Sequence, residues 1–269
     1  MYQGIDTAAR ITATQAAKLR AQGVSFVVRY IGPEAWGKTI TADEIKILSD
    51  AGLSIMLCFE TTANRVKGGA RAGAEDAVTA WKSASALGVP AGTVIFFACD
   101  YNAPEVDFSS IEAYLRSAMM NVEQYGVGLY GPEKVVAAMS ERGACFYFWQ
   151  CVAWSNQFLP VADVRQYAWQ GDARAKAMAA ACGIYAVDLD SAETLAGMWL
   201  PPVKPQPEPW YADTVRWAMK EGVIAPVSSI EDARPEDPAT RAEVMQMIRN
   251  YNKRFEAADI KTASGLLAE

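Results

Sequence analysis

Hydrophobic and polar positions follow two alternating rhythms along the first 200 residues. Short apolar runs, rich in β-branched and aromatic side chains, are typical of buried strands. Between them lie longer stretches with apolar residues at helical spacing. The chain contains eight strand-like runs: Gln3–Asp6, Ser25–Ile31, Ser54–Glu60, Val94–Asp100, Val127–Tyr130, Cys145–Cys151, Asp163–Trp169 and Ile184–Asp188.

The stretches between these runs predict amphipathic helices. They are Thr12–Gln22, Thr41–Ala51, Gly69–Leu87, Ser109–Gln124 and Pro132–Arg142. The first two begin with Thr-rich caps, and the sequences AQG, DAG, ALG and ERG end four of the helices with glycine. The connection Ala153–Ala162 is too short for a full helix. Eight strands alternating with helices favour a closed α/β (β/α)8 TIM barrel over an open doubly wound sheet.

The pattern changes abruptly at residue 200. The segment LPPVKPQPEP, residues 200–209, has five prolines in ten positions and is typical of a semi-rigid linker. We therefore predict a barrel over residues 1–200, a Pro-rich linker over 201–209 and a small all-α module over 210–269. No GxGxxG follows the first strand, so a dinucleotide-binding site is not predicted.

Composition excludes several classes of partner. The chain has 269 residues, of which 51% are hydrophobic, and a formal net charge of −6 without a basic run. Nucleic acid and anionic lipid are therefore not expected as partners. No run approaches the roughly 20 apolar residues of a membrane helix, and the N-terminus lacks a signal-peptide pattern. The five cysteines lack CxxC spacing. We expect a chain made in the cytoplasm, with reduced core cysteines and no membrane insertion.

The sequence contains no histidine. This excludes Ser-His-Asp and Cys-His catalytic units and a zinc site with histidine ligands. Chemistry has to depend on carboxylates, tyrosines, amides or lysines. No metal, nucleotide or redox cofactor is predicted.

Polar and aromatic residues gather where the predicted strands end. In a barrel of this class the active site lies at the C-terminal ends of the strands. The residues predicted there are Asp6, Arg29, Tyr30, Glu60, Asp100, Asn102, Tyr130, Trp149, Gln150, Gln166, Trp169 and Asp188, with Asp190 beyond. Crowded carboxylates repel one another, so at least one should have a raised pKa and serve as a general acid. Tyr and Trp rings suit the apolar faces of sugars, which makes glycoside hydrolysis the natural chemistry.

Each of these residues also has a structural interpretation. An acid at the end of a strand is a common turn former. Trp149 and Trp154 can serve in packing, and Arg29 is more readily a structural partner of Asp6 or Glu60 than a contact to substrate. Tyr30 and Tyr130 fit either interpretation.

Several motifs resemble one known family. GIDTA at 4–8, FVVRYI at 26–31, CFETTA at 58–63, FFACDYNA at 96–103, GLYG at 128–131 and WQCVAWS at 149–155 occur in order. They resemble the glycoside-hydrolase-like TIM-barrel domain called domain of unknown function 1906, which is found in phage endolysins and bacterial cell-wall proteins and is related to family 25 lysozymes.

This resemblance implies a peptidoglycan hydrolase of the phage endolysin type, which acts at the bacterial wall after release from the cytoplasm by other means. In the lysozyme relatives an aspartate ends strand one, a D-x-E pair ends strand four and an aspartate lies on strand eight. These map to Asp6, Asp100 with position 102, and Asp188, but position 102 is Asn102. An amide cannot donate a proton as an acid does. Our hypothesis is therefore that Glu60 is the proton donor and Asp100 the base, nucleophile or electrostatic stabiliser. The alternative is a barrel that binds wall glycan without cleaving it.

The C-terminal residues resemble a single S-layer homology motif. The resemblance lies in an aromatic-x-D start (Tyr211 and Asp213), a helix with Trp217 and Ala218, and the sequence TRAE at 240–243. Thr240 and Glu243 also fit a capping box. It implies attachment to a secondary cell-wall polymer through Trp210, Asp213, Arg241 and Glu243. Such motifs usually work in threes, so weak binding, homo-oligomerisation and a helical hairpin that has lost its ligand all stay open.

Overall fold

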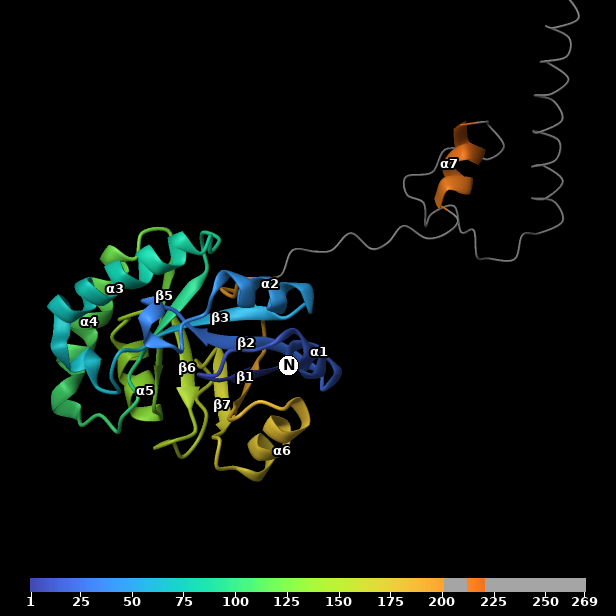
Figure 1. The fold of residues 1–269 in the computed structure, drawn as a ribbon. Coiled ribbons are helices and arrows are strands. Elements are labelled where there is room, and N and C mark those ends of the chain that lie inside the picture. Colours follow the sequence, from blue (N-terminus) through green and yellow to red (C-terminus); the bar gives the residue numbers. More distant parts are fainter. Residues whose placement is uncertain (201–211, 221–269) are drawn as a thin grey trace, which may run out of the picture. The chain divides into compact units, whose positions relative to one another are not determined.

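The computed structural model describes residues 1–200 and 212–220 (Figure 1). The chain divides into two units, Met1–Pro202 and Val203–Glu269. The first unit contains eight strands: β1 (Tyr2–Asp6), β2 (Val24–Tyr30), β3 (Ser54–Phe59), β4 (Val94–Ala98), β5 (Gly126–Gly131), β6 (Tyr147–Cys151), β7 (Val164–Ala168) and β8 (Asp188–Ala192). Its α-helices are α1 (Ala13–Ala21), α2 (Ala42–Asp50), α3 (Gly69–Ala86), α4 (Phe108–Asn121), α5 (Glu133–Glu141) and α6 (Ala173–Cys182).

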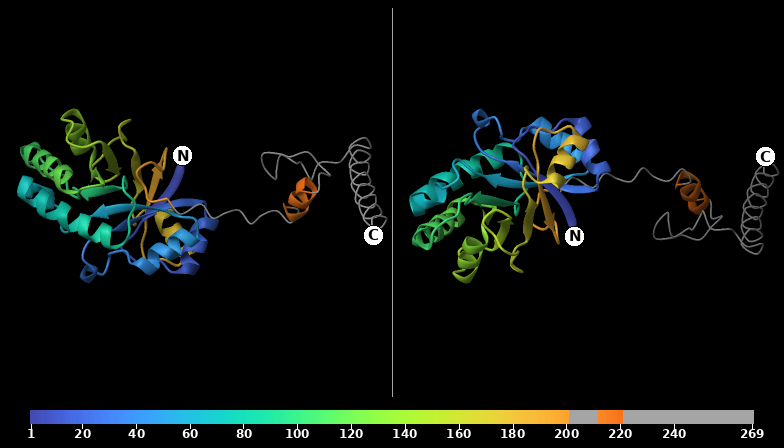
Figure 2. Two further views of the ribbon diagram at one scale, coloured as in Figure 1. Left: turned by 90° about the horizontal axis from the view of Figure 1, so that it is seen from above. Right: turned by 90° about the horizontal axis from the view of Figure 1, so that it is seen from below.

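The eight strands close into a barrel in the order of the chain. Strands β1 to β7 are parallel to their neighbours within this series, and Figure 2 shows the helices arranged around the outside of the sheet. The predicted fold class, a TIM-barrel-like α/β domain, is confirmed. As expected, no helix separates β6 from β7.

Strand β8 differs from the prediction in position and direction. The sequence placed it at Ile184–Asp188, ending on Asp188. It instead begins at Asp188 and runs antiparallel to both β7 and β1. Asp6, which ends β1, is paired with Asp188. Because an antiparallel strand begins at the rim where the parallel strands end, Asp188 still reaches the predicted rim.

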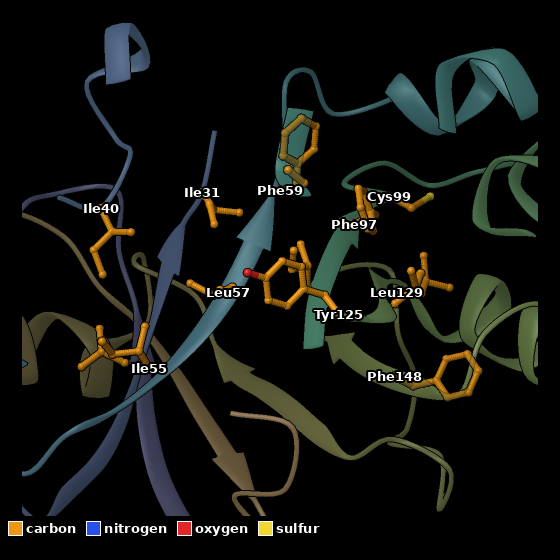
Figure 3. Close-up of a cluster of buried hydrophobic side chains, with 14 of the residues drawn as sticks. Ile31, Ile40, Ile55, Leu57, Phe59, Phe97, Cys99, Tyr125, Leu129 and Phe148 are labelled. Atoms are coloured by element: carbon orange, nitrogen blue, oxygen red, sulfur yellow. The ribbon is translucent and has the colours of Figure 1, made fainter. Parts of the chain in front are cut away.

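Side-chain alternation along the strands separates two apolar layers. Residues such as Ile55, Leu57, Phe97 and Leu129 point away from the barrel axis and belong to one large buried cluster with the helices (Figure 3). The alternate positions of the same strands form a second cluster inside the barrel: Phe26, Val28, Met56, Cys58, Val94, Phe96, Ala98, Tyr130, Trp149, Cys151, Val164, Ala192 and Met198. This period of two decides which residues at the strand ends face inward.

Two glycines let large rings fill the barrel interior. A Cβ atom on Gly4 would lie 2.3 Å from the Phe26 ring, and one on Gly128 would lie 2.5 Å from the Phe96 ring. The rings therefore occupy space that any other residue at these positions would take. The interior is a packed core, so a binding site can open only at an end of the barrel.

The helix boundaries follow the predicted signals. Thr12 and Gln15 form a capping box at the start of α1, and Thr41 caps α2. The four glycines predicted to end helices, Gly23, Gly52, Gly88 and Gly143, all have positive φ. Helix α6 was not predicted. Its Ala-rich sequence lacks a clear apolar face, although Asp172 caps it and Gly183 ends it in the left-handed conformation.

In the second unit the structure describes one helix, α7 (Ala212–Lys220), which falls within the first helix predicted there. The linker 201–209, Trp210, Arg241, Glu243 and the side chain of Asp213 lie outside the described residues, so the wall-binding module stays a prediction. All five cysteines are free and buried. Within residues 1–200 and 212–220, no helix has the length and apolar character needed to cross a membrane.

Candidate active site

A cavity of about 450 Å³ opens at the end of the barrel where β1 to β7 finish and β8 begins. Nine of the twelve residues predicted for the site line it: Asp6, Tyr30, Glu60, Asp100, Tyr130, Trp149, Gln166, Trp169 and Asp188. They come from all eight strands or the residues directly after them. The side-chain alternation of the strands continues to these last positions and brings the polar groups together.

One pair of carboxyl groups lies where β1 meets β8. The side-chain amide of Gln166, on β7, joins Asp6 to Asp188: its Nε2 donates to Asp6 Oδ2 at 2.8 Å and to Asp188 Oδ2 at 3.1 Å. The orientation of this amide is fixed, because its Oε1 accepts from the Tyr130 hydroxyl at 3.1 Å. Both N–H groups of one amide are thus used to hold two acids side by side.

The second pair, Glu60 and Asp100, follows the neighbouring strands β3 and β4. Glu60 forms an ion pair with Lys38, whose Nζ lies 2.7 Å from Glu60 Oε2. The same ammonium lies 4.1 Å from the centroid of the Tyr30 ring. Asp100 follows β4, and the negative charge of Glu60 contributes to the raised pKa of its carboxyl group. Lys38 thus places a positive charge directly against the Glu60 carboxylate.

Burial and mutual repulsion raise the pKa of three of these acids. The pKa of Asp6 is raised to about 7, first by burial and then by the charge of Asp188. Burial raises the pKa of Asp188 to about 6. The pKa of Asp100 is also raised to about 6, by burial and then by Glu60 and Asp188. The expected raised pKa is confirmed, and the first pair retains a proton closer to neutral pH than an ordinary aspartate does.

Aromatic rings form the floor and one wall of the cavity. Tyr130 and Trp149 are buried with their ring centroids 4.3 Å apart. Trp169 is 59% exposed, and its ring lies over Gly171, where a Cβ atom would come within 2.1 Å of it. This contact supports one edge of the ring and leaves much of its surface open to a ligand. Tyr185, in the loop before β8, is 98% exposed.

Three predicted site residues do not line the cavity. Arg29 is fully buried on the outward face of β2, where its Nε donates to Glu44 Oε1 at 2.7 Å. Its partner is therefore Glu44, and not Asp6 or Glu60. Gln150 is buried on the outward face of β6, and its amide binds Gln157 O and Leu159 N in the loop to β7. Asn102 is exposed in the loop after β4. The buried, outward positions of Arg29 and Gln150 correct the prediction that they contact substrate, and Asn102 does not line the cavity.

Sequence reasoning missed Lys38, Gln170 and Tyr185. Gln170 and Tyr185 line the cavity, and Lys38 reaches Glu60 from the loop after β2. Loop residues carry no periodic signal, so no pattern in the sequence pointed to them. Among the described residues no cluster of three or more His, Cys, Asp or Glu side chains fits a metal ion.

The closed barrel gathers four carboxyl groups and closely packed aromatic rings at its strand ends, an arrangement that suits a glycoside hydrolase-like barrel. Residues 17–195 match the model of the Rv2525c-like, glycoside hydrolase-like domain family. This match covers more than half of the chain, and the chain belongs to that family. The resemblance to a glycoside-hydrolase-like barrel is thereby confirmed.

Solved structures support the same fold. The Tat-secreted protein Rv2525c of Mycobacterium tuberculosis, crystallised with L-tartrate, is 25% identical with a TM-score of 0.62, over 74% of this chain and 98% of that chain. An uncharacterised Bacillus stearothermophilus protein is 17% identical with a TM-score of 0.54, over 74% of this chain and 100% of that chain, and shows the fold alone.

Two uncharacterised proteins of Bacillus subtilis are also similar in sequence. YbfG is 30% identical over 166 residues, which is 53% of this chain and 22% of YbfG. FadG is 28% identical over 158 residues, which is 52% of this chain and 26% of FadG. The matched region is thus about a quarter of each relative.

Proposed function

We propose that the barrel hydrolyses a glycosidic bond in the glycan backbone of bacterial peptidoglycan by carboxyl general acid and base catalysis. The observation that supports this proposal is the difference between the two carboxyl pairs. In one pair burial raises the pKa of both acids, whereas in the other Glu60 forms an ion pair with Lys38. Glycoside hydrolysis requires one protonated and one ionised carboxyl group at the same bond.

These environments favour a different division of roles from the sequence-based hypothesis. An ion pair with Lys38 suits Glu60 to the role of a base or a stabiliser of positive charge better than to that of a proton donor. We assign the proton to the Asp6–Asp188 pair, because burial raises the pKa of both acids. Asp188 is the more exposed member of the pair and transfers the proton to the leaving oxygen. Glu60, paired with Lys38, acts as the carboxylate on the opposite side, with Asp100 beside it.

The walls of the cavity suit a sugar polymer. The exposed face of Trp169 offers a stacking surface for one ring, and Tyr130 and Trp149 line the space beside the acids. The motifs shared with phage endolysin barrels favour peptidoglycan as the polymer. The relative Rv2525c is a Tat-secreted protein, which agrees with action outside the cytoplasm.

The decisive experiment compares two substrates with leaving groups of different basicity. Wild type, Asp188→Asn, Glu60→Gln and Asp100→Asn are assayed for release of reducing ends from purified peptidoglycan. The same proteins are assayed with an aryl glycoside of its disaccharide, whose phenolate leaves without protonation. Asp188→Asn should lose about 10²–10⁴-fold on peptidoglycan but less than about 10-fold on the aryl glycoside. Glu60→Gln and Asp100→Asn should lose activity on both.

Asn102→Ala is the matched control, because Asn102 is a polar residue near the mouth that does not line the cavity. It should keep wild-type activity. If Glu60→Gln, and not Asp188→Asn, is rescued by the aryl substrate, the donor is Glu60, as first predicted. If wild type sediments with peptidoglycan but releases no reducing ends, the barrel is a non-hydrolytic glycan-binding domain.

A further inference from the structure

Asp190 is a fourth aspartate at the site, one step deeper in the barrel than the acids that line the cavity. It lies on β8 two residues after Asp188, and its register neighbours are Gly4 of β1 and Gln166 of β7. Side chains two residues apart on a strand share a face, so Asp190 points into the barrel interior below Asp6 and Asp188. It is completely buried.

The two carboxyl oxygens of Asp190 have different surroundings. Oδ1 accepts a hydrogen bond of 2.8 Å from the indole Nε1 of Trp149. Oδ2 is buried without a donor among the described residues. Gln166 cannot supply one, because both of its N–H groups are used by Asp6 and Asp188. The carboxyl group of Asp6, which also interacts with Asp190, is itself an acceptor.

A buried carboxylate with one oxygen unsatisfied and another acid beside it is a costly arrangement. No ion pair in the described part of the chain involves Asp6, Asp188 or Asp190. The groups that face this cluster are neutral or acidic: Trp149 from β6, Gln166 from β7, Tyr130 through Gln166, and the charge of Asp100 from β4. A proton on Asp190 removes its negative charge and turns the unsatisfied oxygen into a hydroxyl, which can donate a hydrogen bond to the neighbouring acid.

We propose that Asp190 keeps its proton throughout the working pH range and donates it in a hydrogen bond to Asp6, as a positioning residue for the acid pair. Two donors, Asp190 and Gln166, then stabilise the ionised form of Asp6. The preference of the pair's proton for Asp6 is thereby reduced, which brings the pKa of Asp6 closer to that of Asp188, the more exposed member. This role rests on the proposed function, but the protonation of Asp190 does not.

The direction of the pKa shift agrees with the geometry. Burial, followed by the negative charge of Asp6, raises the pKa of Asp190 well above its ordinary value. The hydrogen bond from Asp190 acts in the opposite direction on Asp6 and lowers its pKa. Asp190 thus partly offsets the raising effect of burial on its neighbour.

Carboxyl ¹³C NMR of the full chain, labelled at aspartate Cγ, tests protonation without any need for turnover. The Asp190 signal, assigned by its loss in Asp190→Asn, should keep the shift of a neutral acid from pH 4.5 to 8 while the signals of Asp6 and Asp188 titrate. Asp43→Asn, at an exposed acid on α2, is the control for assignment and should leave these titrations unchanged. An Asp190 carboxyl that ionises below pH 5 would overturn the proposal.

Two variants then separate hydrogen bonding from packing. Asparagine can accept from Trp149 with its oxygen and donate to Asp6 with its amide, so Asp190→Asn should leave the titration of the acid pair within about 0.5 pH unit. Asp190→Leu has a similar size but no donor, and should shift the titration of Asp6 upward by about one unit or more. Equal behaviour of the two variants contradicts the donor role. If Asp190→Leu does not fold, the direct titration of Asp190 still decides.

Activity provides a separate readout. If peptidoglycan is cleaved, Asp190→Asn should retain kcat and its pH profile within about twofold, whereas Asp190→Leu should lose activity as the proton moves away from Asp188. Loss of activity in Asp190→Asn with an unchanged acid-pair titration contradicts the positioning role. If wild type cleaves nothing but Asp190 stays neutral in the NMR titration, the hydrolytic proposal fails and the buried acid stands as a feature of a binding site.

Discussion

Arg29 and Glu44 form an ion pair on the outer side of the barrel, with side chains 0% and 3% exposed. Arg29 also donates to the carbonyl oxygens of Thr7 and Lys38, and Glu44 accepts from the backbone N–H of Ile11. One buried charge pair thus ties β2 and α2 to the loops after β1 and β2. These loops hold the mouth of the cavity, so the pair supports the site without touching it.

Glu44→Ala should therefore destabilise the barrel strongly. Removal of one partner leaves the Arg29 guanidinium buried without a counter-charge, which costs about 3–5 kcal/mol. Urea unfolding followed by tryptophan fluorescence measures the change. Asp43→Ala, at the exposed neighbouring acid, should cost less than about 1 kcal/mol. A loss below about 1 kcal/mol for Glu44→Ala would show that water or a rearranged side chain compensates Arg29.

At the residue scale, the positions where strands end predicted most of the residues that line the cavity. The alternation of side chains between the two faces of a strand explains why Arg29 and Gln150 were wrongly included. Tyr30 and Trp149 point into the barrel, so their neighbours Arg29 and Gln150 face outward. Applied strictly, the period of two excludes both from the cavity. Tyr185 could not be found in this way, because it lies in a loop and its position depends on the path of the chain after α6.

Helices α3 and α4 lie side by side on the outside of the barrel (Figures 1 and 2), and their contact depends on one glycine. A Cβ atom on Gly73 of α3 would lie 2.2 Å from the backbone oxygen of Tyr114 on α4. The Tyr114 hydroxyl donates to Asp76 at 2.7 Å, and Arg65 binds the same carboxylate. A polar network therefore holds the two helices at the short distance that Gly73 permits.

Gly73→Ala should lower the melting temperature, although the same change raises intrinsic helix stability. Alanine in a helix is favoured over glycine by about 0.5–1 kcal/mol. The contact with the Tyr114 backbone forces the helices apart, and such overpacking costs about 1–3 kcal/mol. Thermal unfolding gives the sign of the sum, with Lys82→Ala as an exposed control on the same helix. An increase in melting temperature would show that the helices separate at little cost.

At the element scale, the direction of β8 could not be predicted from its pattern. Apolar alternation around residues 184–192 reads the same in either direction. The decisive fact is that Tyr185, Ala186 and Val187 already lie at the mouth of the cavity, with Ala186 O accepting from the Thr7 hydroxyl at 2.7 Å. A strand that starts at the mouth can only run back into the barrel. Its antiparallel direction places Asp190 deep inside, where a parallel strand ending on Asp188 would have left it in a loop.

For the whole barrel, the concentration of acids at one end has a thermodynamic cost. Asp6, Asp100 and Asp188 all have a raised pKa in the folded state, with burial as the first cause. Three acids on the outside of the barrel, the exposed Glu75 and the half-buried Glu112 and Glu133, have a lowered pKa because of arginine partners or backbone N–H groups. The acids with a lowered pKa change the free energy of unfolding only at acidic pH, below the ordinary glutamate pKa of 4.5. The cavity acids therefore dominate the pH dependence above about pH 4.5.

The sign of that dependence follows from proton binding. Between the ordinary pKa of 3.8 and the raised values of about 6 to 7, the folded state binds more protons than the unfolded state. Stability is therefore complete below pH 3.8 with respect to these groups, and it falls as the pH rises toward 7. We expect a loss of roughly 3 kcal/mol or more between pH 4.5 and 7, with the largest shares from the buried Asp6 and Asp190 and smaller ones from the partly exposed Asp100 and Asp188.

The double variant Asp6→Asn, Asp188→Asn should make this profile shallower, because its amides carry no titrating proton, while Asp100 and Asp190 keep their raised pKa. It should be more stable than wild type at pH 7 and closer to wild type at pH 4.5. Urea unfolding at several pH values tests this, and the difference between the two proteins cancels contributions from residues 203–269. A wild-type stability that rises from pH 4.5 to 7 would mean that the cavity acids are solvated in the folded protein. The same cluster could then not retain the proton that the proposed reaction requires.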